Sequence, residues 1–326
     1  MLLGGILVQY LGWRSVFFVN VPIAIAIGCL VAFYVPRDAG DAQRPKLDVT
    51  GALLLTAGLV TLVYTIESIP AFGVTSLQVG SGALVTLALF GVFAMVERRA
   101  IEPILPARLF SYPDLLSGAA VVCLQPMSYA GIMVFSSVYI QSVSHYSPLL
   151  AGLAFLPGAF VISFVAAPLT MPLTRAVGVK TMGILSGVLM IAGEAFLLFM
   201  QPASPYWAGL LPSTVVGGFG GMLAYQSGMI AGLAHVEDAD EGSASAAMSF
   251  ALQLGIGMGV ALCAAVADSI HPLAAGLHAS FWVSIAIGVV MLGAIAAGLR
   301  HAAKAEIPAR RYVHFGRLVH RATVKS

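Results

Sequence analysis

Apolar stretches with the length of a membrane-crossing helix follow one another along almost the whole chain. A helix needs about 20 mostly apolar residues to cross the hydrocarbon core of a bilayer. Nine stretches meet this requirement, near residues 16–35, 49–68, 78–96, 115–139, 151–173, 181–200, 207–233, 243–267 and 277–299. Residues 1–11 are apolar but too short to cross, since a helix rises about 1.5 Å per residue. The pattern predicts an all-α polytopic membrane protein with about nine transmembrane helices plus a partial N-terminal one.

The composition agrees with a membrane protein and argues against other classes. Only 9% of the 326 residues are charged and 59% are hydrophobic, whereas about a quarter of the residues in soluble domains are charged. A net charge of +2 gives no support to a nucleic-acid partner. The three cysteines are far apart, and no Ser/His/Asp or metal-spaced histidine group is present. We therefore expect the lipid bilayer as partner, no cofactor or bound metal, and no enzymatic activity.

Basic residues predict the orientation of the spans. Apart from Arg14, every lysine and arginine lies in residues 36–48, 97–111, 174–180 or the tail after 299. Alternation of nine spans places these four segments on one face. The positive-inside rule predicts that this face, including the C-terminus, is cytoplasmic.

The first 27 residues carry a recognisable pattern. Gly4 and Gly5 lie in an apolar run, Trp13 and Arg14 follow in a short loop, and Asn20-Val-Pro22 opens a new apolar run. This pattern resembles the junction between the fifth and sixth spans of the fourteen-span drug–proton antiporters of the major facilitator superfamily. In that family Gly-Pro stands a few residues before the Gly-Gly pair, and Met1 falls where that proline would be. The resemblance implies that the chain is N-terminally truncated and begins inside a span.

Three further segments are similar to the same family, in its order and spacing. Residues 139–157, which end at Pro157, resemble the hairpin between the ninth and tenth spans. Residues 237–255, with Gln253, resemble the entry to the thirteenth span, and residues 44–48 the entry to the seventh.

Two positions depart from the family pattern. Gly178 and Lys180 match the loop after the tenth span, but Arg175 precedes them where the family has an Asp-Arg pair. Leu252 stands where the family often has arginine before Gln-Leu-Gly. The first departure places the acidic half of a cytoplasmic charge latch in doubt.

The mapping onto the family predicts four parts of the chain. They are the end of an N-terminal half (1–35), two linker spans with cytoplasmic loops (36–111), a C-terminal six-helix bundle (112–299) and a basic cytoplasmic tail (300–326).

Polar side chains inside spans are costly, so each is paired or functional. Gln125 and Tyr129 share one helical face, and Tyr225 and Gln226 lie in a glycine-rich span. The resemblance implies that these spans line a central cavity, which makes the four residues candidates for a mostly apolar substrate pocket. The alternative is hydrogen bonding between helices, which uses the same residue types.

Three acidic or polar features receive structural interpretations. Glu194 is the only carboxylate well inside a span and is a candidate proton carrier. The mapping places it on a peripheral helix near the outer interface, and the preferred interpretation is that it reaches headgroups or water there. Asn20 is expected to satisfy backbone groups near Pro22. The acidic segment 234–241 is expected to be a solvated turn that caps the helix from Ser243.

The resemblance implies secondary transport: proton-coupled efflux of small, drug-like or amphipathic compounds across the cell inner membrane. Alternating access rocks one half of such a transporter against the other. The prediction therefore has two forms, an incomplete antiporter or a half-transporter that needs a complementary N-terminal half. A non-transporting membrane remnant is the rival from another class.

Overall fold

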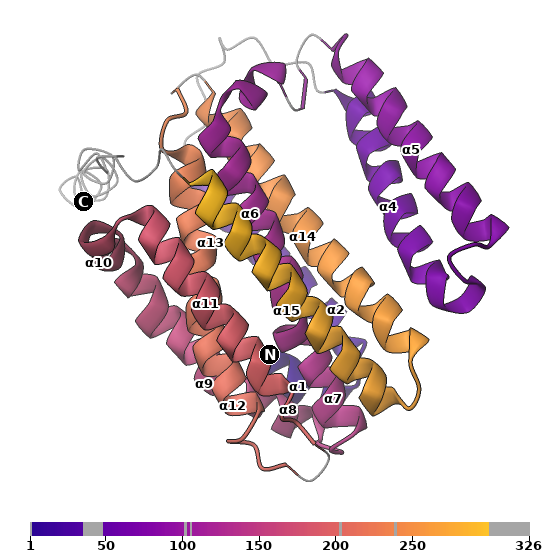
Figure 1. Cartoon of the computed structure of the whole chain (residues 1–326), viewed down its shortest axis with the longest axis vertical. Coiled ribbons are helices and arrows are strands. Elements are labelled where there is room, and N and C mark those ends of the chain that lie inside the picture. Colours follow the sequence, from indigo (N-terminus) through magenta and orange to yellow (C-terminus); the bar gives the residue numbers. More distant parts are fainter. Residues whose placement is uncertain are drawn as a thin grey trace.

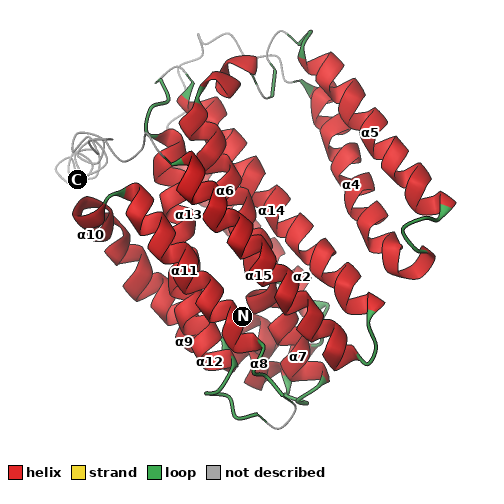
Figure 2. Ribbon diagram, in the orientation of Figure 1, coloured by secondary structure: helices red, strands yellow, loops and turns green. Residues whose placement is uncertain are grey.

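The regular structure is helical throughout the described part of the chain. The computed structural model describes residues 2–34, 48–100, 103–104, 106–201, 204–237 and 240–299. Figure 2 shows helices and loops, and no strand, within these ranges. Eight described segments are long and apolar enough to cross a membrane: Ser15–Phe33, Val49–Phe72, Leu77–Glu97, Pro113–Ser142, Pro148–Val177, Val179–Leu197, Glu241–Ser269 and Leu273–Gly298. The predicted all-α polytopic fold is therefore confirmed. The basic tail and most of the loop 36–48 lie outside the described residues.

The remaining expected span, near 207–233, is helical but less apolar. It is formed by α12 (Leu210–Pro212), η4 (Ser213–Gly217) and α13 (Gly218–Leu233). Glycines and polar side chains such as Gln226 lower its mean hydropathy. Because it packs between α6 and α11, it meets protein on two sides and needs less apolar surface than its neighbours.

The N-terminal elements lie outside the main bundle. They are α1 (Leu2–Leu11), α2 (Ser15–Phe18), α3 (Asn20–Tyr34), α4 (Val49–Phe72) and α5 (Leu77–Glu97). The antiparallel α4–α5 hairpin stands to one side of the molecule, and α4 packs against α14 (Figure 1). Helix α1 packs against α8, whereas α3 is exposed from Val21 to Phe33.

Six spans form the bundle, and α6 lies at its centre in contact with α13, α14 and α15. Its elements, besides α12, η4 and α13, are η1 (Ala107–Ser111), α6 (Pro113–Ala130), η2 (Gly131–Phe135), α7 (Ser136–Ser142), α8 (Pro148–Ala154), α9 (Leu156–Phe160), η3 (Val161–Ala166), α10 (Ala167–Val177), α11 (Val179–Leu197), α14 (Glu241–Ser269) and α15 (Leu273–Gly298). Val121, Met190 and Met291 are fully buried where α6, α11 and α15 meet.

Three spans of the bundle contain a widened, π-helical turn: η2, η3 and η4. A proline precedes each of them in the same span, at Pro126, Pro157 and Pro212. Proline removes a backbone donor and clashes with the carbonyl four residues earlier. Each widened turn thus follows a proline in its own span, and π-helical turns often lie at functional sites.

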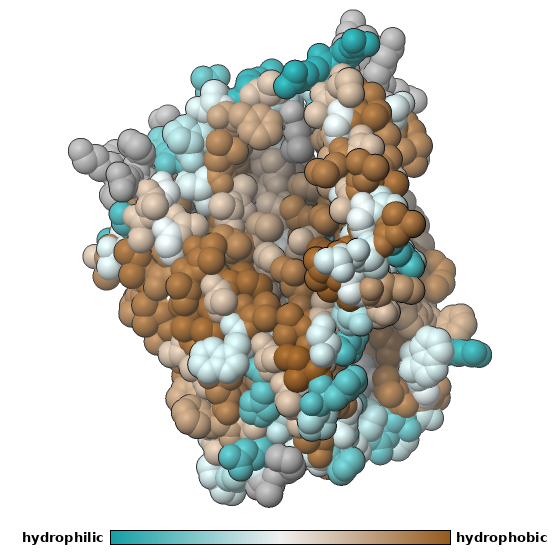
Figure 3. Space-filling model, turned by 45° about the vertical axis from the view of Figure 1, so that its right-hand side comes forward, coloured by the Kyte–Doolittle hydropathy of each residue, from teal (hydrophilic) through white to brown (hydrophobic). Residues whose placement is uncertain are grey.

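The surface has the layering expected in a bilayer. Figure 3 shows apolar residues in a broad band across the middle, with hydrophilic residues towards the upper and lower ends. Arg98, Arg99 and Arg108 lie where α5 ends and α6 begins. We call this end of the bundle the basic end.

Candidate functional site

Helix α1 joins the bundle through a close contact with α8. A Cβ atom on Gly5 would lie 2.6 Å from the carbonyl oxygen of Pro148, so the backbones approach as closely as glycine allows. The backbone N–H of Leu149 also donates to Gln9 Oε1, at 3.3 Å. At Gly4 there is nothing within 4 Å. Of the two motif glycines, only Gly5 is required by this contact.

The other residues of the N-terminal motif lie on exposed surface. Trp13 is 63% exposed, and Arg14 Cζ lies 5.5 Å from the centroid of the Trp13 ring. Both side chains combine an apolar body with a polar tip, which suits a membrane interface. Asn20 Nδ2 donates to the Val16 carbonyl at 3.1 Å. Pro22 lies in the first turn of α3, where a missing N–H costs little.

Three of the four candidate pocket residues lie between α6 and α13. A Cβ atom on Gly221 of α13 would lie 3.0 Å from Gln125 Nε2 and 3.5 Å from Tyr129 Cδ2. Tyr225, one turn further along α13, packs against the buried cluster that includes Val122. Within the described residues no hydrogen bond involves these three side chains.

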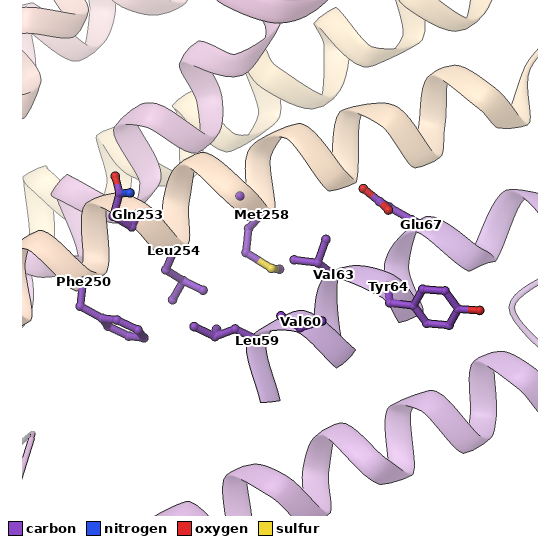
Figure 4. A pocket seen from close by; sticks show the side chains of 10 residues that line it. Leu59, Val60, Val63, Tyr64, Glu67, Phe250, Gln253, Leu254 and Met258 are labelled. Carbon is purple, nitrogen blue, oxygen red and sulfur yellow. The ribbon is translucent and has the colours of Figure 1, made fainter. Parts of the chain in front are cut away.

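Gln226 and Gln253 lie elsewhere. Gln226 is half-buried and makes no hydrogen bond among the described residues. Gln253 is exposed on α14, where it lines a cavity of about 530 Å³ between α14 and α4 (Figure 4). The lining is almost wholly apolar apart from Gln253, Tyr64 and Glu67: Leu59, Val60, Val63, Phe250, Leu254, Gly257 and Met258. Its size and lining suit the apolar body of a small molecule.

Glu194 is not near headgroups or water, and that prediction was wrong. Its side chain is fully buried inside the bundle, where α11 meets α6 and α15. Ser128 Oγ lies 2.7 Å from Glu194 Oε1 and 2.8 Å from the Ser284 carbonyl oxygen. Glu194 Oε2 is buried without a hydrogen-bond partner. The mapping did not predict the face of α11 on which Glu194 lies.

The acidic segment at the basic end is also more than a solvated turn. Asp240 precedes α14 but its side chain does not cap the helix; it forms an ion pair with Arg108 Nε at 2.5 Å and accepts from Tyr112 Oη at 3.1 Å. Partial burial, and then the hydrogen bond to Asp240, raise the pKa of Tyr112 above its usual value, so the phenol stays protonated and donates.

A second contact at the basic end joins α6 to the loop between α13 and α14. Asp114, in the first turn of α6, is only 6% exposed, and its Oδ2 lies 2.8 Å from His235 Nδ1. Gly178 links α10 to α11 with a φ of 81°, a conformation that favours glycine, and Lys180 follows in the first turn of α11.

Comparison with known protein families identifies the family to which the chain belongs. The sequence model of the Major Facilitator Superfamily matches residues 1–170. The chain belongs to the Major Facilitator Superfamily. It is therefore a multi-pass membrane protein of a transporter superfamily.

Drug-resistance and export proteins are among its relatives in the superfamily. The chain is 32% identical over 274 residues to the puromycin resistance protein pur8 of Streptomyces alboniger, covering 80% of this chain and 52% of the relative. It is 33% identical to the cephamycin export protein CmcT of Amycolatopsis lactamdurans, covering 68% and 46%. It is 30% identical to the multidrug resistance protein Stp of Mycobacterium tuberculosis, covering 62% and 37%. The chain thus spans about half the length of the curated relatives that it matches.

A sequence signal for the buried position of Glu194 does exist. Gly183 and Gly187 are four residues apart, a spacing that lets membrane helices pack closely, and Glu194 follows Gly187 by two helical turns on the same face. The contact between Asp240 and Arg108 had no such signal, because the partners are far apart in sequence.

Proposed function

We propose that the chain takes part in proton-coupled efflux of small drug-like or amphipathic compounds across the cell inner membrane, with its basic end and C-terminus in the cytoplasm. Its relatives include two drug-resistance proteins and a cephamycin export protein, which supports export of such compounds. The distribution of lysine and arginine supports the orientation.

The observation that carries the proposal is the unpaired polar surface between α6 and α13. Gln125 is buried and Tyr129 half-buried beside the glycines of α13, yet neither forms a hydrogen bond among the described residues. The polar atoms of both side chains keep some accessible surface, since neither side chain has a fully buried polar atom without a partner. A substrate with an apolar body and one or two polar groups would supply the missing partners, as small-molecule sites usually do.

Transport by this chain would also need a second half. Alternating access in this superfamily moves two halves around a central site, and the chain spans about half of its relatives. The exposed apolar surface of α3 offers a place for such a half to pack. The rival proposal, a non-transporting membrane protein, requires no second half.

The test is an efflux assay in a drug-sensitive bacterial host that produces the chain with and without a complementary N-terminal half. Accumulation of ethidium is measured before and after a protonophore. We expect Gln125→Ala and Gln226→Ala to reduce export and Gln141→Ala to leave it unchanged, since Gln141 is exposed and bonds only Ser137 of its own helix. Export that is absent with both halves present would favour the rival, and export insensitive to the protonophore would refute proton coupling.

A further inference from the structure

The hydrogen-bonding distances around Glu194 indicate whether its carboxyl group carries a proton. Ser128 Oγ is within hydrogen-bonding distance of two oxygens, Glu194 Oε1 and the Ser284 carbonyl. A carbonyl oxygen can only accept, and a serine hydroxyl has a single proton to donate. If Glu194 were ionised, two acceptors would share that one proton. If Glu194 is protonated, its O–H donates to Ser128 Oγ and the Ser128 O–H donates to Ser284, so both contacts are complete hydrogen bonds.

Burial and the lack of a cation lead to the same protonation state. Glu194, Ser128 and Ser284 are all fully buried. Neither of the ion pairs among the described residues involves Glu194. An ionised carboxylate without a counter-charge in an apolar interior is far more costly than the neutral acid. The fully buried carboxyl is therefore neutral in this conformation.

Few other titratable groups face this carboxyl. Tyr129 on α6 and Cys263 on α14 lie close enough to interact with it electrostatically. Cys263 Sγ is also 3.5 Å from Ser284 Oγ. The η2, η4 and α12 segments pack against α11 and contain no titratable side chain. His278 of α15 packs on Tyr139 instead, and Arg175 of α10 forms no ion pair among the described residues.

We propose that Glu194 is a proton-binding site of this transporter, protonated in the present conformation and deprotonated when the surrounding helices admit water. The inference rests on the proposed proton-coupled efflux and assigns the proton to a residue. In the release step the O–H bond of the carboxyl breaks, its electron pair stays on the carboxylate, and the proton passes to water. The Ser128 hydroxyl then turns from the Ser284 carbonyl to Glu194 Oε1, so the carboxylate keeps one donor.

The widened turns supply a place for that rearrangement. Both η2 and η4 pack against α11, and Gly193, beside Glu194, is in direct contact with Gly217 at the end of η4. π-helical turns are irregular single turns that are frequent at functional sites. A change in the η4 turn would alter the contact between α13 and α11 beside the carboxyl.

The experiment compares the wild-type chain with Glu194→Gln and with Asp268→Asn as the matched control. Asp268 is exposed near the end of α14, so its loss should not affect the buried site. Glutamine keeps the shape of the side chain and can still donate to Ser128. Infrared spectra of the purified chain in nanodiscs are recorded from acid to alkaline pH. The wild type and Asp268→Asn should show the carbonyl stretch of a neutral carboxyl at neutral pH, and Glu194→Gln should lose it.

A second measurement follows proton exchange. Binding of ethidium to the chain with its complementary half is measured in weakly buffered solution with a pH indicator. Binding of ethidium should release protons from the wild type and from the control Asp268→Asn. Glu194→Gln should still bind ethidium but release no protons. A band that survives Glu194→Gln, a wild type without the band at neutral pH, or undiminished proton release by Glu194→Gln would each overturn the proposal. If the infrared band of Glu194 titrates but the chain exports no ethidium, the proton site would be supported and the proposed function refuted.

Discussion

Replacement of Gly118 by alanine tests the closest approach of two spans in the bundle. Gly118 lies on α6, opposite α13. A Cβ atom there would lie 2.5 Å from Gly232 Cα, 2.6 Å from the Gly228 carbonyl oxygen and 2.7 Å from Gly232 N. All three are backbone atoms, so no side chain can rotate away. The helices themselves would have to separate.

The expected cost follows from these distances. Carbon atoms in contact are normally about 3.5–4.0 Å apart, so α6 and α13 must move apart by roughly 1 Å. Overpacking of this kind costs about 1–3 kcal/mol, and a contact with backbone atoms belongs in the upper part of that range. Alanine recovers about 1 kcal/mol through its higher helix propensity. We therefore expect Gly118→Ala to lower the free energy of unfolding by roughly 1–2 kcal/mol.

The assay is thermal unfolding of the purified chain in detergent, followed by circular dichroism. Gly293→Ala is the matched control, because Gly293 is exposed on α15 and its Cβ would have nothing within 4 Å. The control should match or exceed the wild type in its unfolding midpoint. Equal midpoints for Gly118→Ala and Gly293→Ala would refute the argument that backbone contact holds α6 against α13.

Three further predictions concern the edges of the bundle. Gly5→Ala should lower the unfolding midpoint, because its Cβ would clash with the α8 backbone, whereas Gly4→Ala should not; equal effects would contradict the contact. The raised pKa of Tyr112 means that its bond to Asp240 contributes fully to stability below about pH 10 and is lost as the pH rises further. A pH series of unfolding midpoints should show this alkaline loss in the wild type and not in Tyr112→Phe. Alkaline phosphatase should be active when fused between α7 and α8 and inactive when fused after α5, and the reverse result would overturn the proposed orientation.

The positions of the spans could be predicted because hydropathy is a local property. The stretch expected at 243–267 is α14, Glu241–Ser269, and the stretch expected at 49–68 is α4, which continues to Phe72. The differences at the ends arise from capping. Asp48 accepts the backbone N–H of Gly51 at 2.8 Å and starts α4, whereas Gly73, with a φ of 81°, ends it.

Contacts between residues that are far apart in the sequence could not be predicted from it. Gly228 and Gly232 have the four-residue spacing that favours close helix packing, but their partner Gly118 has no glycine at the matching spacing. Likewise, the charge pattern favoured a solvated acidic turn, and only the fold brings Arg108 to Asp240. A local sequence pattern shows that the residues on one face of a helix are small or charged. It does not show which other segment that face contacts.

The packing around Glu194 links these observations to transport. A Cβ atom on Gly288 would lie 3.0 Å from Ser128 Oγ and 3.3 Å from Glu194 Oε2, so α15 has room for the carboxyl only because that residue is glycine. The same close packing leaves no space for a cation or a solvent shell beside the carboxyl. A proton is then the one positive charge small enough to neutralise Glu194 while the helices remain in contact. Loss of that proton favours an arrangement in which α11 and α15 are further apart and water reaches the carboxylate. Under the proposal above, protonation and close packing belong to one state, and deprotonation and separation of the helices to the other. This linkage is the coupling that proton-driven transport would require.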